Sequence, residues 1–193
     1  MAGRPRIFDE EISLKKATNL FWEKGYEATS TEDLMKEMGM LRGSFYNMFN
    51  SKKELFIKAI NSHEDCQLEE LRKEFANSKQ PIQSIKEMFF SLADAKIDEH
   101  IKGCLLGNII TELSNVDEEL VNVAKRHLTV FENIFYEQIK KSQETGELKS
   151  QEDPKVLASY LLNLWNGINI TRRIHTDKKT LRQLIEFQLS FLN

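Results

Sequence analysis

The stretch from residue 30 to residue 53 constrains the fold of this chain more than any other. Ser30 and Asp33 have the spacing of a capping box at the start of a helix. Gly39 supplies a residue that tolerates positive φ, as a sharp turn between two helices requires. A short aromatic-rich helix follows, and Ser51 can cap a third. This layout is typical of a DNA-reading helix-turn-helix, although an ordinary corner between two helices has the same elements.

The charge of the chain is distributed unevenly. The whole protein of 193 residues carries a net charge of −3, whereas residues 1–60 carry +1 and residues 39–58 carry +3. A local basic face on a mildly acidic protein fits a sequence-specific DNA binder better than a protein that coats DNA in general.

Several classes of protein are disfavoured by the sequence. Its apolar runs are shorter than the roughly 18 residues that a membrane span needs, and its start lacks a signal-peptide pattern, so we expect a cytoplasmic protein. Cys66 and Cys104 should be free thiols there. The four histidines have no metal-ligand spacing, and the nucleophile-elbow, phosphate-loop and zinc-protease motifs are absent. We therefore predict no metal, no cofactor and no enzymatic activity.

The pattern of apolar residues, caps and breaks predicts an all-α fold with nine helices. We expect a helix-turn-helix domain over 1–50, a connecting helix over about 51–77 and a second helical domain over 78–193. The segment just before Gly103 should break the chain between two helices, and Asn115 should cap the next one. The nine helices are expected at about 9–24, 30–38, 42–50, 51–77, 81–97, 103–114, 116–145, 154–174 and 177–193.

The last two helices are apolar around more than one face. A helix that packs only against its own core keeps a polar back, so this pattern favours a four-helix interface between two copies of the chain. Burial of both helices within one protomer is the alternative. The residues predicted for the interface are Tyr160, Leu164, Ile168, Leu184, Phe187 and Phe191.

The residues of the N-terminal quarter match a known pattern over about 8–58. The matching segments are F-W-E-K-G-Y-E-A-T-S-T-E-D-L at 21–34, M-G at 38–39, R-G-S-F-Y at 42–46, Phe49 and S-K-K-E-L-F at 51–56. They resemble the DNA-binding domain of tetracycline-repressor (TetR) family regulators. The resemblance implies a homodimer, a palindromic double-stranded DNA operator, and a small-molecule effector pocket among the fifth to eighth helices. It implies a repressor more often than an activator.

The resemblance also assigns roles to residues of the head. It implies base-edge or phosphate contacts by Arg42 and Ser44, close backbone approach at Gly43, and phosphate contacts by Tyr46 and Lys52. Ser30 or Thr31 would cap a helix beside a phosphate, and Asn47 is free to contact a base or a phosphate.

Two positions depart from the family pattern. Leu41 stands where a small hydroxyl residue is common, so the usual cap of the recognition helix is missing, and Met48 stands where His or Tyr is common. Before the first helix, Arg4 and Arg6 flank a proline in an extended arm. This arm could contact a minor groove, or it could be an ordinary terminus with two arginines.

Two kinds of signal remain open for the second domain. Cys104 lies at a helix N-terminus with Lys102 nearby, where amides would stabilise a thiolate, and it resembles a cysteine in the electrophile-sensing branch of the family. It could equally be a small buried hydrophobe. A conventional ligand is the competing signal. Its pocket could be lined by Phe89, Phe90, Phe131, Phe135 and Trp165, with polar anchors among Asn108, Glu112, Asn169 and Arg172.

The aromatic residues could instead be plain core. The remaining alternative for the whole chain is a helical dimer that acts as an adaptor or binds a small molecule without binding DNA. That alternative does not explain why the chain has a capped, locally basic helix-turn-helix unit.

Overall fold

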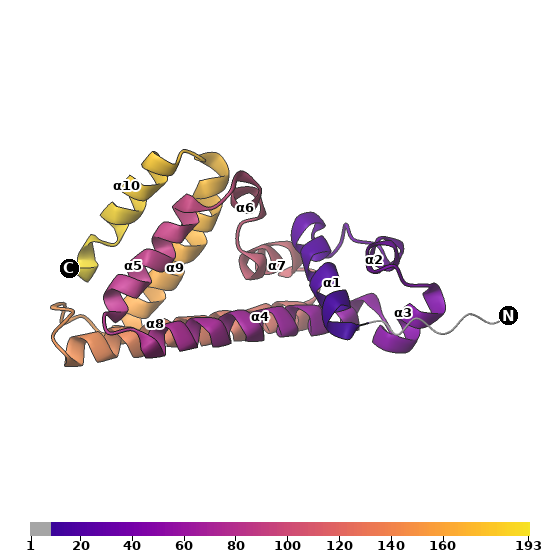
Figure 1. Ribbon diagram of the computed structural model, residues 1–193, viewed down its shortest axis with the longest axis horizontal. Coiled ribbons are helices and arrows are strands. Elements are labelled where there is room, and N and C mark those ends of the chain that lie inside the picture. The colour runs from indigo at the N-terminus through magenta and orange to yellow at the C-terminus, as the bar shows by residue number, and fades with distance from the viewer. Residues whose placement is uncertain (1–8) are drawn as a thin grey trace.

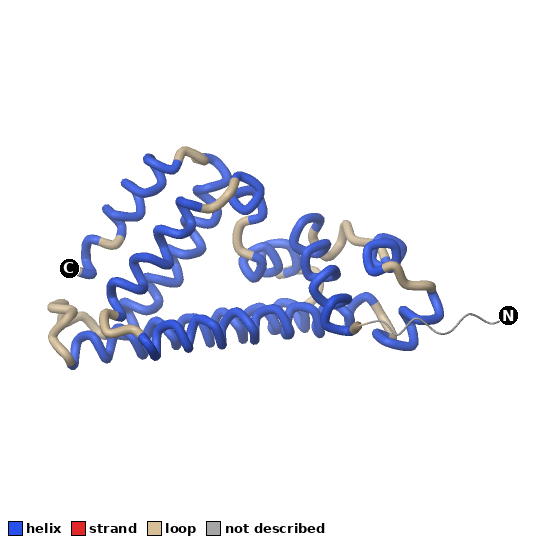
Figure 2. The backbone as a smooth tube through the Cα atoms, viewed as in Figure 1, coloured by secondary structure: helices blue, strands red, loops and turns tan. Residues whose placement is uncertain are grey.

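The computed structural model describes residues 9–193, and within them every regular element is a helix (Figures 1 and 2). Arg4 and Arg6 lie outside the described residues. The elements are α1 (Glu10–Lys24), α2 (Thr31–Met38), α3 (Arg42–Phe49), α4 (Lys52–Asn77), α5 (Pro81–Asp94), α6 (Ile97–Lys102), α7 (Leu105–Leu113), α8 (Glu118–Glu144), α9 (Pro154–Ile174), α10 (Lys178–Gln188) and the short 3-10 helix η1 (Ser190–Leu192).

The all-α prediction is confirmed, and the elements differ from it in three places. The expected break before Gly103 contains the short helix α6, so the described residues form ten α-helices rather than nine. Asp117 caps α8 in place of Asn115, because its carboxylate accepts from the amides of Glu119 and Leu120 at 3.1 and 3.2 Å. The last helix stops at Gln188 and gives way to η1.

Two long helices organise the molecule. α4 and α8 run side by side along one edge, with α1–α3 at one end and α5, α9 and α10 at the other (Figure 1). We call α1–α3 the head and α5–α10 the sensor domain. α7 lies against α8 next to the head (Figure 1).

The apolar interior forms two clusters that do not follow the sequence boundaries. One cluster lies at the far end of the molecule from the head and joins α5, α9, α10, the second half of α4 and the later turns of α8. The other contains the head core together with Leu105, Ile109 and Leu113 of α7 and Leu120 of α8. The head is therefore completed by residues more than fifty positions further along the chain.

The turn chemistry expected for the head is present. Ser30 Oγ accepts from the Asp33 amide at 3.0 Å, and the Asp33 carboxylate accepts from the Ser30 amide at 3.2 Å. Gly39 has φ +68° and ends α2 in the left-handed conformation. α3 starts after Leu41, whose side chain makes no capping hydrogen bond and is 79% exposed.

The missing cap predicts a stabilising substitution. Leu41→Thr should raise the free energy of unfolding by about 0.5–1 kcal/mol, because a hydroxyl can satisfy an amide of the first turn and little apolar burial is lost. Urea denaturation at fixed protein concentration measures the change. Ser30→Ala is the matched control and should lower stability by about 1 kcal/mol. A lower stability of Leu41→Thr would mean that the leucine has a packing role that outweighs the cap.

Candidate DNA interface and sensor cavity

The recognition helix α3 has one buried and one exposed face. Phe45 and Phe49 are fully buried and fix the helix to the head core. Ser44 is half-buried beside them. The exposed face consists of Arg42, Gly43, Tyr46 and Asn47. The Arg42 guanidinium lies 5.7 Å from the centre of the Tyr46 ring, so a cation and a phenol hydroxyl share one end of this face.

Gly43 has no packing reason to be glycine. A Cβ built on it would meet nothing within 4 Å among the described residues. A glycine inside a helix loses stability relative to alanine, so the position is explained better by an object outside the protomer that must come close to the backbone.

Lys52, expected to contact a phosphate, is already bound within the head. Its ammonium donates to the carbonyls of Tyr26 and Thr29 at 2.9 and 3.0 Å and lies 4.1 Å from the centre of the Tyr26 ring. An ammonium has three donors, so one remains for a phosphate. Thr31 donates to Glu32 at 3.2 Å, and Met48 is half-buried against the head core.

Glu112 joins the sensor domain to the head. Its carboxylate, near the end of α7, accepts from the backbone amides of Tyr26 and Glu27 at 3.1 and 2.8 Å. These amides belong to the loop between α1 and α2. Trp22 adds a second link, because its indole Nε1 donates to the carbonyl of Lys102 at 3.2 Å. Glu112 was expected to anchor a ligand, and the structure gives its carboxylate this other task.

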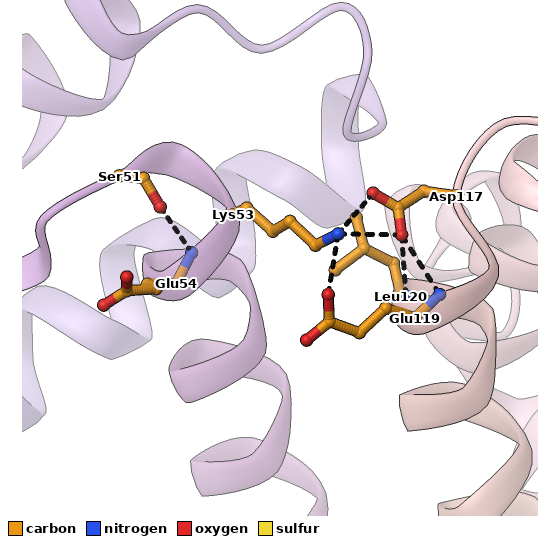
Figure 3. A network of polar contacts seen from close by, with 6 residues as sticks. All are labelled: Ser51, Lys53, Glu54, Asp117, Glu119 and Leu120. Atoms are coloured by element: carbon orange, nitrogen blue, oxygen red, sulfur yellow. Dashed lines mark hydrogen bonds and ion pairs between the residues drawn. The ribbon is translucent and has the colours of Figure 1, made fainter.

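A third link ties α4 to α8, as Figure 3 shows. Lys53 Nζ lies 2.8 Å from a carboxylate oxygen of Asp117 and 2.8 Å from one of Glu119. These contacts raise the pKa of Lys53, and the hydrogen bond from Lys53 lowers the pKa of Asp117. Sequence reasoning missed this pair and the Glu112 contact, since partners more than sixty positions apart leave no local signal.

The sensor domain contains a cavity of about 570 Å³. It lies among α4, α5, α6, α7, α8 and α9, and Trp22 of α1 also lines it. Two of the predicted aromatic residues, Phe131 and Trp165, line it with their ring centres 5.2 Å apart. Phe89 and Phe135 are fully buried behind them and belong to the core. Phe90 packs beneath the Arg182 guanidinium, away from the cavity lining.

A larger groove of about 1000 Å³ is lined by α1 and the loop after it on the head side, and by α6, α7 and α9 on the other side. Asn108 and Glu112 line this groove rather than the cavity. The Asn108 amide donates to the Lys102 carbonyl at 2.8 Å and accepts from Arg173 at 2.6 Å. Both expected ligand anchors are thus satisfied within the protein, whereas Asn169 and Arg172 do line the cavity.

Cys104 lies where the cavity and the groove meet. Its Sγ caps α7 by accepting from the Gly107 amide at 3.4 Å. Burial nevertheless raises the pKa of the thiol, and the amide offsets only part of that effect. The Lys102 ammonium pairs with Glu23 at 2.8 Å. The helix amides therefore favour the thiolate as expected, but desolvation of the charged form has the larger effect on the pKa of Cys104.

Other kinds of site find no support in the part of the chain that the structure describes. Residues 9–193 bring no three metal-ligating side chains together. No helix among them is long and apolar enough to cross a membrane.

An exposed short helix after a glycine turn, tied to a helical domain that contains an open cavity, is the arrangement of a helix-turn-helix regulator with a separate sensing domain. Residues 14–59 match the family model described as bacterial regulatory proteins, tetR family. Residues 82–187 match the tetracyclin repressor-like C-terminal domain. The chain belongs to the TetR family of DNA-binding transcriptional regulators, and it is not an enzyme.

The proteins that are similar to this chain over nearly its whole length are transcriptional regulators. It is 28% identical to the uncharacterized regulator YezE of Bacillus subtilis, over 99% of this chain and 100% of that protein. It is 28% identical to the transcriptional repressor ComR of Escherichia coli, over 94% of this chain and 88% of that protein. The same fold occurs in a cysteine-substituted CifR bound to 26-bp operator DNA, with TM-score 0.82, 23% identity and coverage of 99% and 100%.

The environment of Cys104 predicts slow, pH-dependent alkylation. Iodoacetamide should modify Cys104 more slowly than the exposed Cys66 at neutral pH, because only the thiolate attacks and burial raises the pKa of Cys104. The rate at Cys104 should still be rising above pH 9. Mass spectrometry of timed samples measures both sites in one protein. Faster modification of Cys104 than of Cys66 at pH 7 would contradict the raised pKa.

Proposed function

We propose that the protein is a cytoplasmic homodimeric repressor that binds a palindromic operator through α3 and releases it when a small effector occupies the cavity of the sensor domain. The observation that carries this proposal is the exposed face of α3, where Arg42, Tyr46 and Asn47 surround the unobstructed Gly43. Membership of a family whose members form dimers and bind effectors supports it further.

The side chains of this face suit different parts of a DNA duplex. Arg42 can donate two hydrogen bonds to the edge of a guanine, or it can pair with a phosphate. Asn47 can form two hydrogen bonds with the edge of an adenine. Tyr46, Ser30 and the remaining donor of Lys52 are suited to phosphates. Phosphate contacts set the register on the duplex and make affinity fall with salt, whereas Arg42 and Asn47 would give preference for a sequence.

The DNA contacts are tested with two substitutions of α3. Arg42→Ala should weaken binding to the operator by about 10- to 100-fold, as loss of a base contact costs about 1–3 kcal/mol. Gly43→Val should also weaken binding, because a side chain would hold the backbone away from the duplex, while the fold is kept because its Cβ has open space. Electrophoretic shift with the DNA flanking the protein's own gene measures both.

Arg126→Gln, at an exposed position of α8, is the matched control and should bind like the unaltered protein. Equal affinity of Arg42→Ala and the unaltered protein would remove α3 from the interface. Failure of the unaltered protein to shift any DNA would favour the helical adaptor instead.

The proposed dimer surface differs from the predicted one. Leu164 and Ile168 are 5% and 1% exposed and lie in the core of the protomer, so they do not face a partner. The outward face of α9 carries Val156, Tyr160, Gly167, Ile170 and Ile174 at helical spacing, which we call the outward stripe. Phe187 of α10 is exposed, whereas Leu184 and Phe191 are half-buried, with Phe191 packed edge-on against Tyr160.

The outward stripe has the composition of an interface. The outward stripe exposes four large apolar side chains on one helix, with the polar Asn163 between Tyr160 and Gly167, and such clusters often mark protein–protein contacts. A Cβ on Gly167 would meet nothing within 4 Å among the described residues, which leaves room for close approach of a partner helix. Twofold pairing of α9 and α10 would place two copies of α3 on one side of the dimer, as a palindromic operator requires.

Gly167→Glu tests this surface. It should raise the dissociation constant of the dimer at least tenfold, because a charge would be buried at the closest approach, while helicity measured by circular dichroism is retained. Sedimentation equilibrium gives the constant. Asn122→Glu, exposed on α8, adds the same charge elsewhere and should leave the dimer unchanged. An unchanged dimer in Gly167→Glu would place the interface on another face.

Thiol modification is the second candidate for the releasing signal. Cys104 caps α7 with its sulfur and lies between the cavity and the groove beside the head, so an adduct would remove the cap and occupy space at the base of α7. Release of DNA by N-ethylmaleimide should then be lost in Cys104→Ser and kept in Cys66→Ser. Equal release from both variants would leave the cavity ligand as the signal.

A further inference from the structure

A buried cation without a counter-ion lines the cavity. Arg172, in the last turn of α9, is 6% exposed. Its Nη2 donates to the Gly103 carbonyl at 3.3 Å, and its Nε is buried without a hydrogen-bond partner among the described residues. None of the ion pairs within residues 9–193 includes it.

Such a group is costly unless something pairs with it. Burial lowers the pKa of Arg172, and the neighbouring Cys104 and Glu99 oppose that effect, while the like charge of Arg173 adds to it. The side chain stays protonated at neutral pH all the same, because the ordinary pKa of arginine is so high. A buried guanidinium with free donors is suited to a planar anion such as a carboxylate, which it can bind through two parallel hydrogen bonds.

A hydrogen-bond acceptor lies one turn before the cation on the same helix. Asn169 is 3% exposed and also lines the cavity. Its Nδ2 donates to the Trp165 carbonyl at 2.9 Å, which leaves Oδ1 buried without a partner among the described residues. Buried polar groups are almost always hydrogen-bonded, so two neighbouring exceptions at one cavity mark a place for a polar ligand group.

The rest of the cavity divides into an apolar wall and an acidic set. The wall consists of Leu68, Leu71, Met88, Leu92, Phe131 and Trp165. Glu70, Glu74 and Glu99 are exposed on the lining and would repel a second negative charge. Glu64 also lines the cavity, and burial raises its pKa to about 7, so it is partly neutral at physiological pH.

We propose that the effector is a small monocarboxylic acid with an aryl or alkyl body, whose carboxylate pairs with Arg172 and whose body packs on Phe131 and Trp165. The cavity of about 570 Å³ falls within the range that holds small ligands. A hydroxyl or N–H group near the carboxylate would donate to Asn169. This inference rests on the proposed function for its regulatory meaning, whereas the binding site itself can be measured without DNA.

The test compares acids with their amides on the full-length protein. Benzoate, 3-phenylpropanoate, 2-naphthoate and octanoate are titrated by calorimetry, each beside its neutral amide and, for 3-phenylpropanoate, beside 3-phenylpropylamine. At least one acid should bind at least tenfold more tightly than its amide. Arg172→Gln should weaken that acid at least tenfold and leave the amide within threefold. Arg126→Gln, at an exposed position of α8, should change neither.

The comparison of acid with amide is made on the unaltered protein. It therefore tests the proposal even if Arg172→Gln fails to fold. Binding of no acid at millimolar concentration, equal binding of acid and amide, or tighter binding of the amine would overturn the proposal. An acid that binds through Arg172 but does not release DNA in the shift assay would confirm the site and contradict the proposed effector response.

Discussion

The head of this protein depends on α7, because neither its core nor its loop geometry is complete without that helix. Leu105, Ile109 and Leu113 of α7 fill the same apolar cluster as Phe45 and Phe49 of the head. Glu112 then fixes the loop before α2 by accepting from two consecutive backbone amides. Burial supplies most of the free energy of this contact, while the carboxylate fixes its geometry.

α7 consequently borders both regions on which regulation would depend. Its first turns, with Cys104, Leu105 and Leu106, line the cavity, and its last turn holds the head through Glu112. The pair of Lys53 with Asp117 and Glu119 holds the start of α4 against the start of α8 (Figure 3). Close-packed interiors transmit displacement rather than absorb it. A structural change at the cavity therefore has a short path, through α7, to the recognition helix α3.

α9 contributes to both the ligand cavity and the proposed dimer surface, through opposite faces. Its inward face supplies Trp165, Asn169 and Arg172 to the cavity, and its outward stripe is exposed around Gly167. This explains why the helix is apolar around more than one face. The sequence pattern alone favours an interface, whereas the structure divides the same residues between a core, a cavity lining and an exposed surface.

The sequence by itself determined the local features of this protein. The capping box at Ser30, the left-handed turn at Gly39, the missing cap at Leu41 and the helical class all follow from neighbouring residues, because caps and periodicity act within a few positions. Only the tertiary structure decided which of the expected ligand residues meet. It assigned Asn108 and Glu112 to internal bonds, buried Leu164 and Ile168, raised the pKa of Cys104, and left Arg172 unpaired at a cavity. Burial and hydrogen-bond partners are set by segments far apart in the chain, and the residue type alone does not record them.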